Sequence, residues 1–197
     1  MNISCEDAGN VSVFSAIIAL ISLLWHIIKD AFTYFRKKSD RLNLKLCDEI
    51  ALYDNVYSIK IINLSPNATA YNLHAQLYIV NKIKGYRGKL PDFYAPSHLY
   101  SIKQDKDPRA REILIHIDTK RIENIEYMDV SNKKNERIDN KLELVDLLQE
   151  QSTYLAVRYN AVNNITENPK EYPMKEFYYY NIKHGFFGAG DEYVTET

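Results

Sequence analysis

The sequence predicts a mainly β protein, in which one N-terminal transmembrane α-helix precedes an antiparallel β-sandwich with one short helix. Three observations lead to this fold class. A long uncharged run lies near the N-terminus of the 197-residue chain. Segments with alternating apolar and polar residues follow it, separated by turn-forming residues about every 8–15 positions. One later segment alone has the periodicity of a helix.

The apolar run extends from Val11 to Ile28 and reads VSVFSAIIALISLLWHII. No Asp, Glu, Lys or Arg lies between Asp7 and Lys29, a window of 21 residues. As a helix, this window would be about 31 Å long, which matches the hydrocarbon thickness of a bilayer. No later segment forms a comparable run, so we expect a single membrane span.

Charged residues flank this run asymmetrically. Glu6 and Asp7 precede it, whereas basic residues follow it at Lys29, Arg36, Lys37, Lys38, Arg41 and Lys45. The positive-inside rule then places the N-terminus outside and the rest of the chain in the cytoplasm. A basic n-region and a cleavage site are missing, so we expect the helix to be retained. The expected segments are an extracytoplasmic tail (1–10), the helix with a juxtamembrane extension (11–38), a linker (39–47) and a cytoplasmic domain (48–197).

Small and polar residues recur on one side of the predicted helix, at alternating spacings of three and four. This seam comprises Ser12, Ser15, Ala19, Ser22, His26, Lys29, Thr33 and Arg36. Lipid favours apolar residues on all sides of a lone helix, so such a face is expected to meet other helices or water. The 3.5-residue period favours a left-handed bundle. We therefore expect a homo-oligomer within the lipid bilayer.

Two interpretations of the seam remain open. In the first, Ser and Ala let helices pack closely, through pairs such as Ser12–Ala16 and Ser15–Ala19. In the second, several copies surround a pore, and the seam faces its water. Packing accounts for residues 12–22, but His26 and Lys29 carry ionisable groups near membrane depth, which need water or a partner.

The domain is expected to consist of short strands joined by turns. The expected strands are Tyr57–Leu64, Ala70–Ile83, Arg111–Asp118, Arg121–Met128, Thr153–Val162 and Met174–Ile182. In the second of these, the apolar positions from Leu73 to Ile79 should face the core. The segment Lys84–Pro96 should be a loop, and Asn140–Gln151 a short helix capped by Asn140.

The string YYYNIKHGFF (Tyr178–Phe187) resembles the end of the cytoplasmic immunoglobulin-like domain of inward-rectifier potassium channels. There an aromatic strand precedes an Ile-x-x-Gly-x-x-aromatic turn, and Ile182, Gly185 and Phe186/Phe187 hold comparable places. His184 stands where a Trp is usual. The stretch 57–80, the IHID segment (115–118) and the helix over 140–151 are similar to earlier parts of that domain. The resemblance implies an immunoglobulin-like sandwich that assembles as a tetramer.

The sequence has no pore helix and no Thr-x-Gly-[Tyr/Phe]-Gly filter, so selectivity by rings of backbone carbonyls is not expected. One helix joined to such a sandwich resembles small membrane effectors of bacterial anti-phage nucleotide-signalling systems, of which the Hailong type is the nearest. This second resemblance implies a pore in the bacterial inner (plasma) membrane, opened or closed by a nucleotide, that depolarises the cell.

A basic and aromatic cluster lies at the start of the expected loop. It comprises Lys82, Lys84, Tyr86, Arg87 and Lys89. Stacking of a base on the aromatic ring, with neutralisation of phosphate by the cations, is how a nucleotide or short oligonucleotide would bind there. A surface that faces anionic lipid and a solvated turn are the alternatives.

Catalysis has no support in the sequence. The five histidines lack metal-ligand spacing, and His74 and His116 fall in strands, where structural roles are expected. The glycine-rich stretch from Gly185 to Gly190 should be a turn that closes the last strand. No nucleophile elbow, phosphate loop or carboxylate pair is present. We therefore expect no enzymatic activity, no metal and no cofactor.

Together these features favour an oligomeric, ligand-gated pore of the plasma membrane. Rings of His26 and Lys29 would give its inner mouth a positive field that disfavours small cations. The alternative is a membrane-anchored, non-conducting β-sandwich that senses or recruits a partner.

Overall fold

The computed structural model describes residues 5–83, 85–117, 124–127 and 143–196; the side chains of residues 5–16, 37–39, 86 and 124–127 lie outside this description. The chain divides into two compact units, Met1–Asp40 and Arg41–Thr197. Each unit is described by itself.

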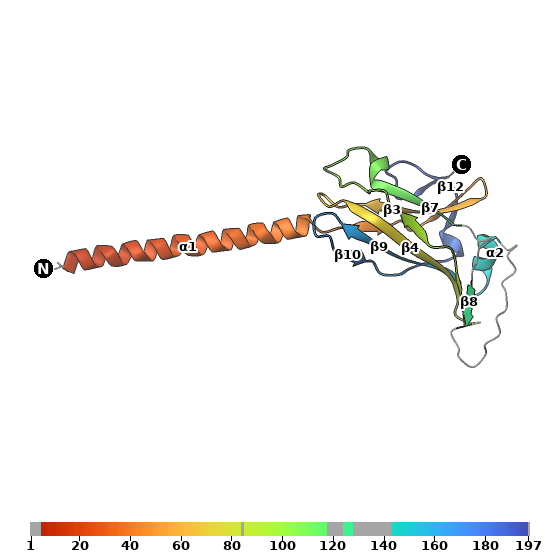
Figure 1. The fold of residues 1–197 in the computed structure, drawn as a ribbon, viewed down its shortest axis with the longest axis horizontal. Coiled ribbons are helices and arrows are strands. Elements are labelled where there is room, and N and C mark those ends of the chain that lie inside the picture. The colour runs from red at the N-terminus through yellow and green to blue at the C-terminus, as the bar shows by residue number, and fades with distance from the viewer. Residues whose placement is uncertain (1–4, 84, 118–123, 128–142, 197) are drawn as a thin grey trace. The chain divides into compact units, whose positions relative to one another are not determined.

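The first unit is one uninterrupted helix, α1 (Cys5–Ser39), drawn in red to orange in Figure 1. Its segment Ile17–Arg36 is long and apolar enough to cross a membrane, and none of that segment is buried within the chain. The predicted N-terminal apolar helix is thus confirmed. The helix as described begins at Cys5, however, so residues 5–10 of the tail expected over 1–10 are helical. Glu6 and Asp7 fall in the first turn, where acidic residues favour a helix.

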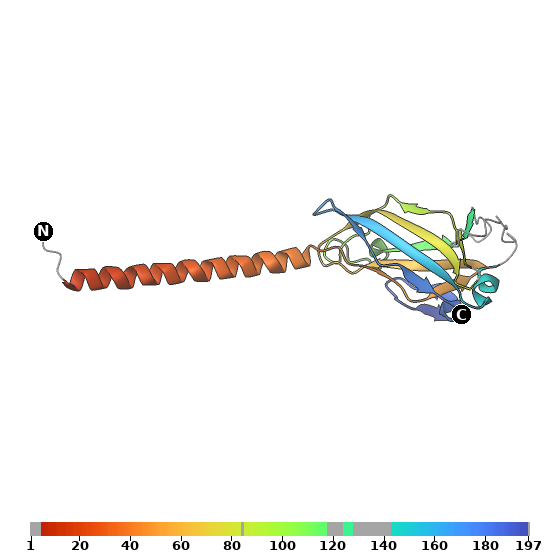
Figure 2. The same ribbon diagram turned by 90° about the horizontal axis from the view of Figure 1, so that it is seen from below.

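The second unit is a sandwich of two β-sheets, drawn from two sides in Figures 1 and 2. The first sheet contains β1 (Leu44–Leu46), β2 (Ile50–Tyr53), β3 (Val56–Asn63), β7 (Glu112–Ile117), β12 (Ile182–Phe187) and β13 (Val194–Glu196). Strands β1 and β2 pair with successive parts of one edge of β3, and β7 pairs with the other edge. The sheet is not wholly antiparallel, because β12 runs parallel to β2.

The second sheet is built around a long antiparallel ladder between β4 and β9. It contains β4 (Ala70–Asn81), β5 (Tyr86–Lys89), β6 (Phe93–Ala95), β8 (Asn124–Tyr127), β9 (Thr153–Asn163), β10 (Pro169–Glu171) and β11 (Lys175–Phe177). Among the described residues, the unit also contains the short helix α2 (Leu144–Gln149) and the 3₁₀ turns η1 (Pro108–Arg111) and η3 (Tyr179–Asn181). The predicted mainly β sandwich with one short helix is confirmed.

The hydrophobic core lies between the sheets. Ile59 and Ile61 of β3 and Leu77 and Ile79 of β4 are almost completely buried and belong to one apolar cluster. On β4 the intervening side chains are partly exposed, as the predicted alternation requires. The register of this strand was therefore readable from its sequence.

The stretch 39–47, expected to be a linker, instead contains strand β1 and belongs to the sandwich from Arg41 onward. Leu42, Leu44 and Leu46 are buried, and they alternate as the residues of a strand do. The second unit therefore begins at Arg41, within the stretch expected to be a linker.

The expected loop Lys84–Pro96 contains two further strands, β5 and β6, which pair with β4. Gly85, at φ +64°, supplies the turn between β4 and β5. Gly88 and Pro91 obscure the alternation of these strands in the sequence. Helix α2 begins at Leu144 after Glu143; the predicted cap Asn140 lies outside the described residues, as do most of the positions flanking β8.

The strand expected over Met174–Ile182 is divided in the structure. It ends as β11 at Phe177, and the chain then turns through η3 into β12. Asn181 stabilises this turn, because its side chain accepts a hydrogen bond from the Tyr178 N–H at 2.7 Å. Gly185 is likewise not in a closing turn but inside β12, at φ +142°. A Cβ at Gly185 would lie 2.0 Å from the Thr195 carbonyl oxygen, so glycine allows β13 to pair there.

One lysine is completely buried. Lys60 on β3 has no exposed side-chain surface, and its Nζ lies 2.6 Å from Glu112 Oε2. The same ammonium donates to the carbonyl oxygens of Gly188 at 2.6 Å and Asp191 at 3.1 Å. Three acceptors therefore surround three N–H donors, which is the arrangement that a buried cation needs. The contacts hold the turn between β12 and β13 against the first sheet.

Candidate functional site

The seam residues are exposed wherever the structure describes their side chains. Ala19, Ser22, His26 and Lys29 all lie on α1 with exposed side chains. Ser12 and Ser15 lie on the same helix, but their side chains are outside the described residues. The helix is continuous past all of these positions, so the spacing of the seam places its members on one side.

Two side chains of this seam, those of His26 and Thr33, hydrogen-bond within the helix. The His26 Nδ1–H donates to the Ser22 carbonyl oxygen at 2.7 Å, and the Thr33 hydroxyl donates to the Lys29 carbonyl oxygen at 2.8 Å. In the neutral ring this leaves His26 Nε2 as an acceptor. One turn further on, Arg36 Nε lies 3.8 Å from Asp40 Oδ2.

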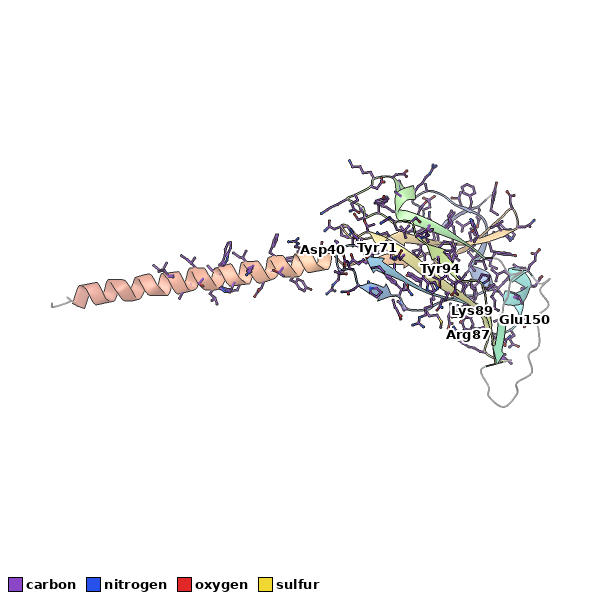
Figure 3. All side chains as sticks on the ribbon, in the orientation of Figure 1. Asp40, Tyr71, Arg87, Lys89, Tyr94 and Glu150 are labelled. Carbon is purple, nitrogen blue, oxygen red and sulfur yellow. The ribbon has the colours of Figure 1, made fainter. Side chains whose placement is uncertain are left out.

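The predicted basic cluster lies on the β4–β5 hairpin rather than in a loop, as the labels of Arg87 and Lys89 in Figure 3 show. The Arg87 guanidinium lies 3.4 Å from the ring centre of Tyr78, and Lys89 Nζ lies 3.1 Å from Asp92 Oδ1. Lys82 Nζ lies 3.6 Å from Glu176 Oε1. Lys84 and the side chain of Tyr86 are outside the described residues. Each described cation therefore already has a partner in the chain.

Sequence reasoning missed a row of tyrosine rings beside this hairpin. Tyr154, Tyr178 and Tyr180 follow one another at ring separations of 5.6 Å. Lys82 Nζ lies 4.6 Å above the ring of Tyr154. Tyr154 comes from β9, and the other two come from the segment around η3. The sequence placed these aromatics in strands but had no signal that they would meet the basic residues.

A second group missed by the sequence holds the free edge of β1. The Asn43 carbonyl oxygen accepts from the Leu64 N–H, and the Cys47 N–H donates to the Lys60 carbonyl oxygen. Because backbone hydrogen bonds alternate along an antiparallel pair, Leu42, Leu44 and Leu46 direct their backbone groups away from β3. Side chains from β9, β10 and β11 bind those groups; we call Tyr159, Lys170, Tyr172 and Lys175 the β1 clamp. It joins the first strand after α1 to the second sheet through side chains rather than through a backbone ladder.

The tyrosines of the clamp bind the start of β1 and the residue two positions before it. The Tyr172 hydroxyl donates to the Leu42 carbonyl oxygen at 3.2 Å and accepts from the Leu44 N–H at 3.1 Å. The Tyr159 hydroxyl donates to the Leu44 carbonyl oxygen at 3.3 Å. The two rings stack 4.7 Å apart. Burial raises the pKa of each tyrosine to about 12, so both remain neutral donors over the physiological range.

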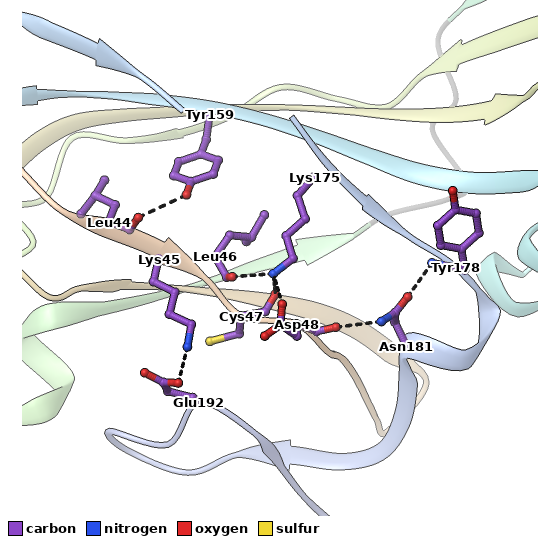
Figure 4. Close-up of polar contacts among 10 residues, drawn as sticks. All are labelled: Leu44, Lys45, Leu46, Cys47, Asp48, Tyr159, Lys175, Tyr178, Asn181 and Glu192. Atoms are coloured by element: carbon purple, nitrogen blue, oxygen red, sulfur yellow. Dashed lines mark hydrogen bonds and ion pairs between the residues drawn. The ribbon is translucent and has the colours of Figure 1, made fainter. Parts of the chain in front are cut away.

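The lysines of the clamp bind the two ends of the segment. Lys170 Nζ donates to the Leu42 carbonyl oxygen at 2.6 Å, and burial lowers the pKa of its ammonium. Lys175 Nζ donates to the carbonyl oxygens of Leu46 at 2.8 Å and Cys47 at 3.0 Å (Figure 4). It also bonds Asp48 at 2.5 Å, which lowers the pKa of that carboxyl. A cavity of about 440 Å³ opens beside these contacts and is lined by Leu44, Tyr172 and Met174, among others.

Two histidines of the sandwich, His74 and His116, have structural partners. His116 Nδ1 lies 2.8 Å from the Ser58 hydroxyl, and His74 Nε2 lies 3.3 Å from Asp92 Oδ2. Among the described residues, no three His, Cys, Asp or Glu side chains are grouped so that they could hold a metal ion. In the comparisons with known proteins, no protein-family model and no curated protein matches this chain.

Proposed function

We propose that this protein is a homo-oligomeric membrane effector whose α1 helices surround an ion-conducting pore, gated by a ligand on the sandwich. The observation that carries the proposal is the exposed seam. Over Ile17–Arg36 the helix presents polar residues on one side and apolar residues on the others, and none of them is covered by the chain. Only a second helix or water suits the polar side within a bilayer.

The resemblance described above supplies the finer parts of the proposal. We infer a tetramer in a bacterial plasma membrane, with the N-terminus outside and the sandwich in the cytoplasm. Opening of the pore would depolarise the cell, as an anti-phage effector does. The basic residues between Lys29 and Lys45 support this orientation.

The β1 clamp supports coupling between ligand and pore. Leu42, where two clamp residues bind, lies two positions after Asp40, at which the helical unit ends. A ligand that moves β9, β10 or β11 would therefore displace the segment that continues into α1. We propose that this displacement is the conformational change that gates the pore.

The β4–β5 hairpin and its tyrosine row are the proposed ligand site. A nucleotide would stack on the tyrosine rings and draw Lys82 from Glu176 and Lys89 from Asp92. We expect a nucleotide-induced rise in the unfolding temperature of the full chain, and its loss in the Lys84→Glu/Arg87→Glu variant. Binding of anionic vesicles without any nucleotide effect would assign the hairpin to lipid instead.

One observation favours the alternative of a non-conducting anchored module. The His26 Nδ1–H is satisfied by its own helix, so this imidazole needs less from water or a neighbour than an unbonded ring would. An anchored sandwich that senses or recruits a partner would therefore also tolerate this helix.

Currents across planar bilayers distinguish the two functions. Purified full-length protein should conduct, and His26→Leu should alter the conductance. Ser22→Leu should block the current, because the added bulk fills the seam. Ala31→Leu, a similar addition on the opposite side of α1, is the matched control and should conduct normally. Absence of conductance in the wild-type protein, with no toxicity on expression, would favour the anchored module.

A further inference from the structure

Lys29 and Asp30 are adjacent charged residues of α1 that have no partner in their own helix. A helical residue meets those three and four positions away. For Lys29 these are Trp25, His26, Phe32 and Thr33, none of them acidic. In the part of the chain that the structure describes, no ion pair involves either residue, and both side chains are exposed.

Arg36 provides the contrast within the same seam. Its acidic neighbour Asp40 lies four residues on, and the two side chains are 3.8 Å apart. The charge of Arg36 is therefore balanced within one chain. Asp30 has no such cation, because its helical neighbours are His26, Ile27, Thr33 and Tyr34. His26 directs Nδ1 to the Ser22 carbonyl oxygen instead.

The heptad geometry brings the two unpaired charges together between chains. With Ser12 at position a, Lys29 falls at position d and Asp30 at position e. In a parallel bundle, a d side chain enters a hole formed by four residues of the next helix, among them the d residue and the e residue that follows it. The Lys29 ammonium of one copy therefore meets the Asp30 carboxylate of its neighbour.

We propose that Lys29 of each chain pairs with Asp30 of the adjacent copy, forming a ring of ion pairs that holds the α1 helices parallel and in register. This inference rests on the proposed oligomer. If neighbouring helices ran antiparallel, Lys29 of one copy would not face Asp30 of the next all around the bundle. A neighbouring helix without charges at these positions would leave both Lys29 and Asp30 unpaired at the edge of the membrane. The pairing also reduces the positive field that Lys29 was expected to give the inner mouth of the pore. The His26 side chains of the assembled copies then form the main polar ring there.

Charge reversal tests this pairing with full-length protein in detergent. Lys29→Asp gives acidic residues at both positions, and Asp30→Lys gives basic residues at both. We expect each variant alone to associate at least about tenfold more weakly than the wild type, because like charges then face each other. The exchanged double variant Lys29→Asp/Asp30→Lys should recover association. Asp40→Asn, which affects a charge already balanced within the chain, is the control and should associate normally.

Mixing the two single variants gives the sharper result. Co-expressed with different tags, Lys29→Asp and Asp30→Lys should co-purify as mixed oligomers, while each variant alone associates more weakly than the wild type. Single variants that associate as the wild type does would overturn the ion-pair ring and leave the proposed oligomer standing. A wild-type chain that is monomeric in mild detergents and in nanodiscs would overturn both.

Discussion

The helix and the sandwich satisfy their polar groups over very different distances along the chain. On α1 the described contacts join residues four apart, as in His26 with Ser22 and Arg36 with Asp40. In the sandwich, the contacts of the β1 clamp join residues 115 to 130 apart. A helix that bonds only to itself leaves its sides to lipid or to other chains. The sandwich completes its own interior, so single substitutions there should change stability directly.

The largest effect on the sandwich is expected from Lys60→Met. The substitution leaves the largely buried Glu112 carboxylate without its cation, and it removes the ammonium donor from the carbonyl oxygens of Gly188 and Asp191. We expect the free energy of unfolding to fall by about 3–5 kcal/mol. Chemical denaturation followed by near-UV circular dichroism of the tyrosines measures it, since the single Trp lies in α1.

The double variant Lys60→Met/Glu112→Gln is the control for that experiment. It removes the buried carboxylate as well, so it should recover part of the lost stability. If Lys60→Met leaves the denaturation midpoint unchanged, the sandwich does not depend on long-range polar contacts, and the contrast with α1 fails.

High pH should weaken the sandwich through the two clamp tyrosines. Their pKa is 10.0 in an unfolded chain and about 12 in the folded one. Between these values the unfolded chain loses protons that the folded chain keeps, so the free energy of unfolding falls as pH rises from about 10 to about 12. Below pH 10 this contribution is fully present.

The variant Tyr159→Phe/Tyr172→Phe isolates this effect from other groups that titrate at high pH, such as Cys47, whose pKa burial raises to about 11. We expect it to be less stable at neutral pH but to show a flatter decline between pH 10 and 12. If the free energy of unfolding of this variant falls as steeply between pH 10 and 12 as that of the wild type, the hydroxyls of Tyr159 and Tyr172 are not responsible for the pH dependence.

The features that could be predicted from the sequence are those that depend on residues close together in the chain, and the features that could not be predicted depend on distant residues. The helix and β4 could be predicted because their apolar periodicity is visible in a short stretch of sequence. Each residue on the side that faces lipid or the core has to be apolar. Strand β1 was interpreted as a linker because three residues are too few to show a period, although Leu42, Leu44 and Leu46 do alternate. The clamp left no signal, since Tyr172 and Leu42 lie 130 positions apart.

The basic cluster was half predictable for the same reason. The run from Lys82 to Lys89 is visible in the sequence, and the structure does bring Arg87 and Lys89 together on one hairpin. Their partners Tyr78, Asp92 and Glu176 come from positions that only the folded sheet makes adjacent. The sequence could therefore indicate the basic residues, but not that Lys82, Arg87 and Lys89 each have a partner within the folded chain.

A single clamp hydroxyl should have a moderate effect. Tyr172→Phe keeps the stacking on Tyr159 but removes the group that bridges Leu42 and Leu44. We expect a loss of about 1–2 kcal/mol, because a buried N–H then lacks its acceptor. Tyr94→Phe, which removes the hydroxyl of a ring 66% exposed and stacked on His74, should change stability by less than about 0.5 kcal/mol.

The smallest effect is expected at the β4–β5 hairpin, where the contact of Lys82 with Glu176 is exposed. Lys82 is more than half exposed, and its 3.6 Å contact with Glu176 is of the surface type that contributes at most about 1 kcal/mol. Lys82→Gln should therefore leave the denaturation midpoint almost unchanged, while removing the cation above Tyr154 that a phosphate would use. If nucleotide still raises the unfolding temperature of this variant as much as that of the wild type, Lys82 takes no part in binding. A large fall in the free energy of unfolding of Lys82→Gln would instead mean that this contact stabilises the sandwich as much as the buried contacts do. Hydration of Glu176 would then not compensate for the loss of Lys82.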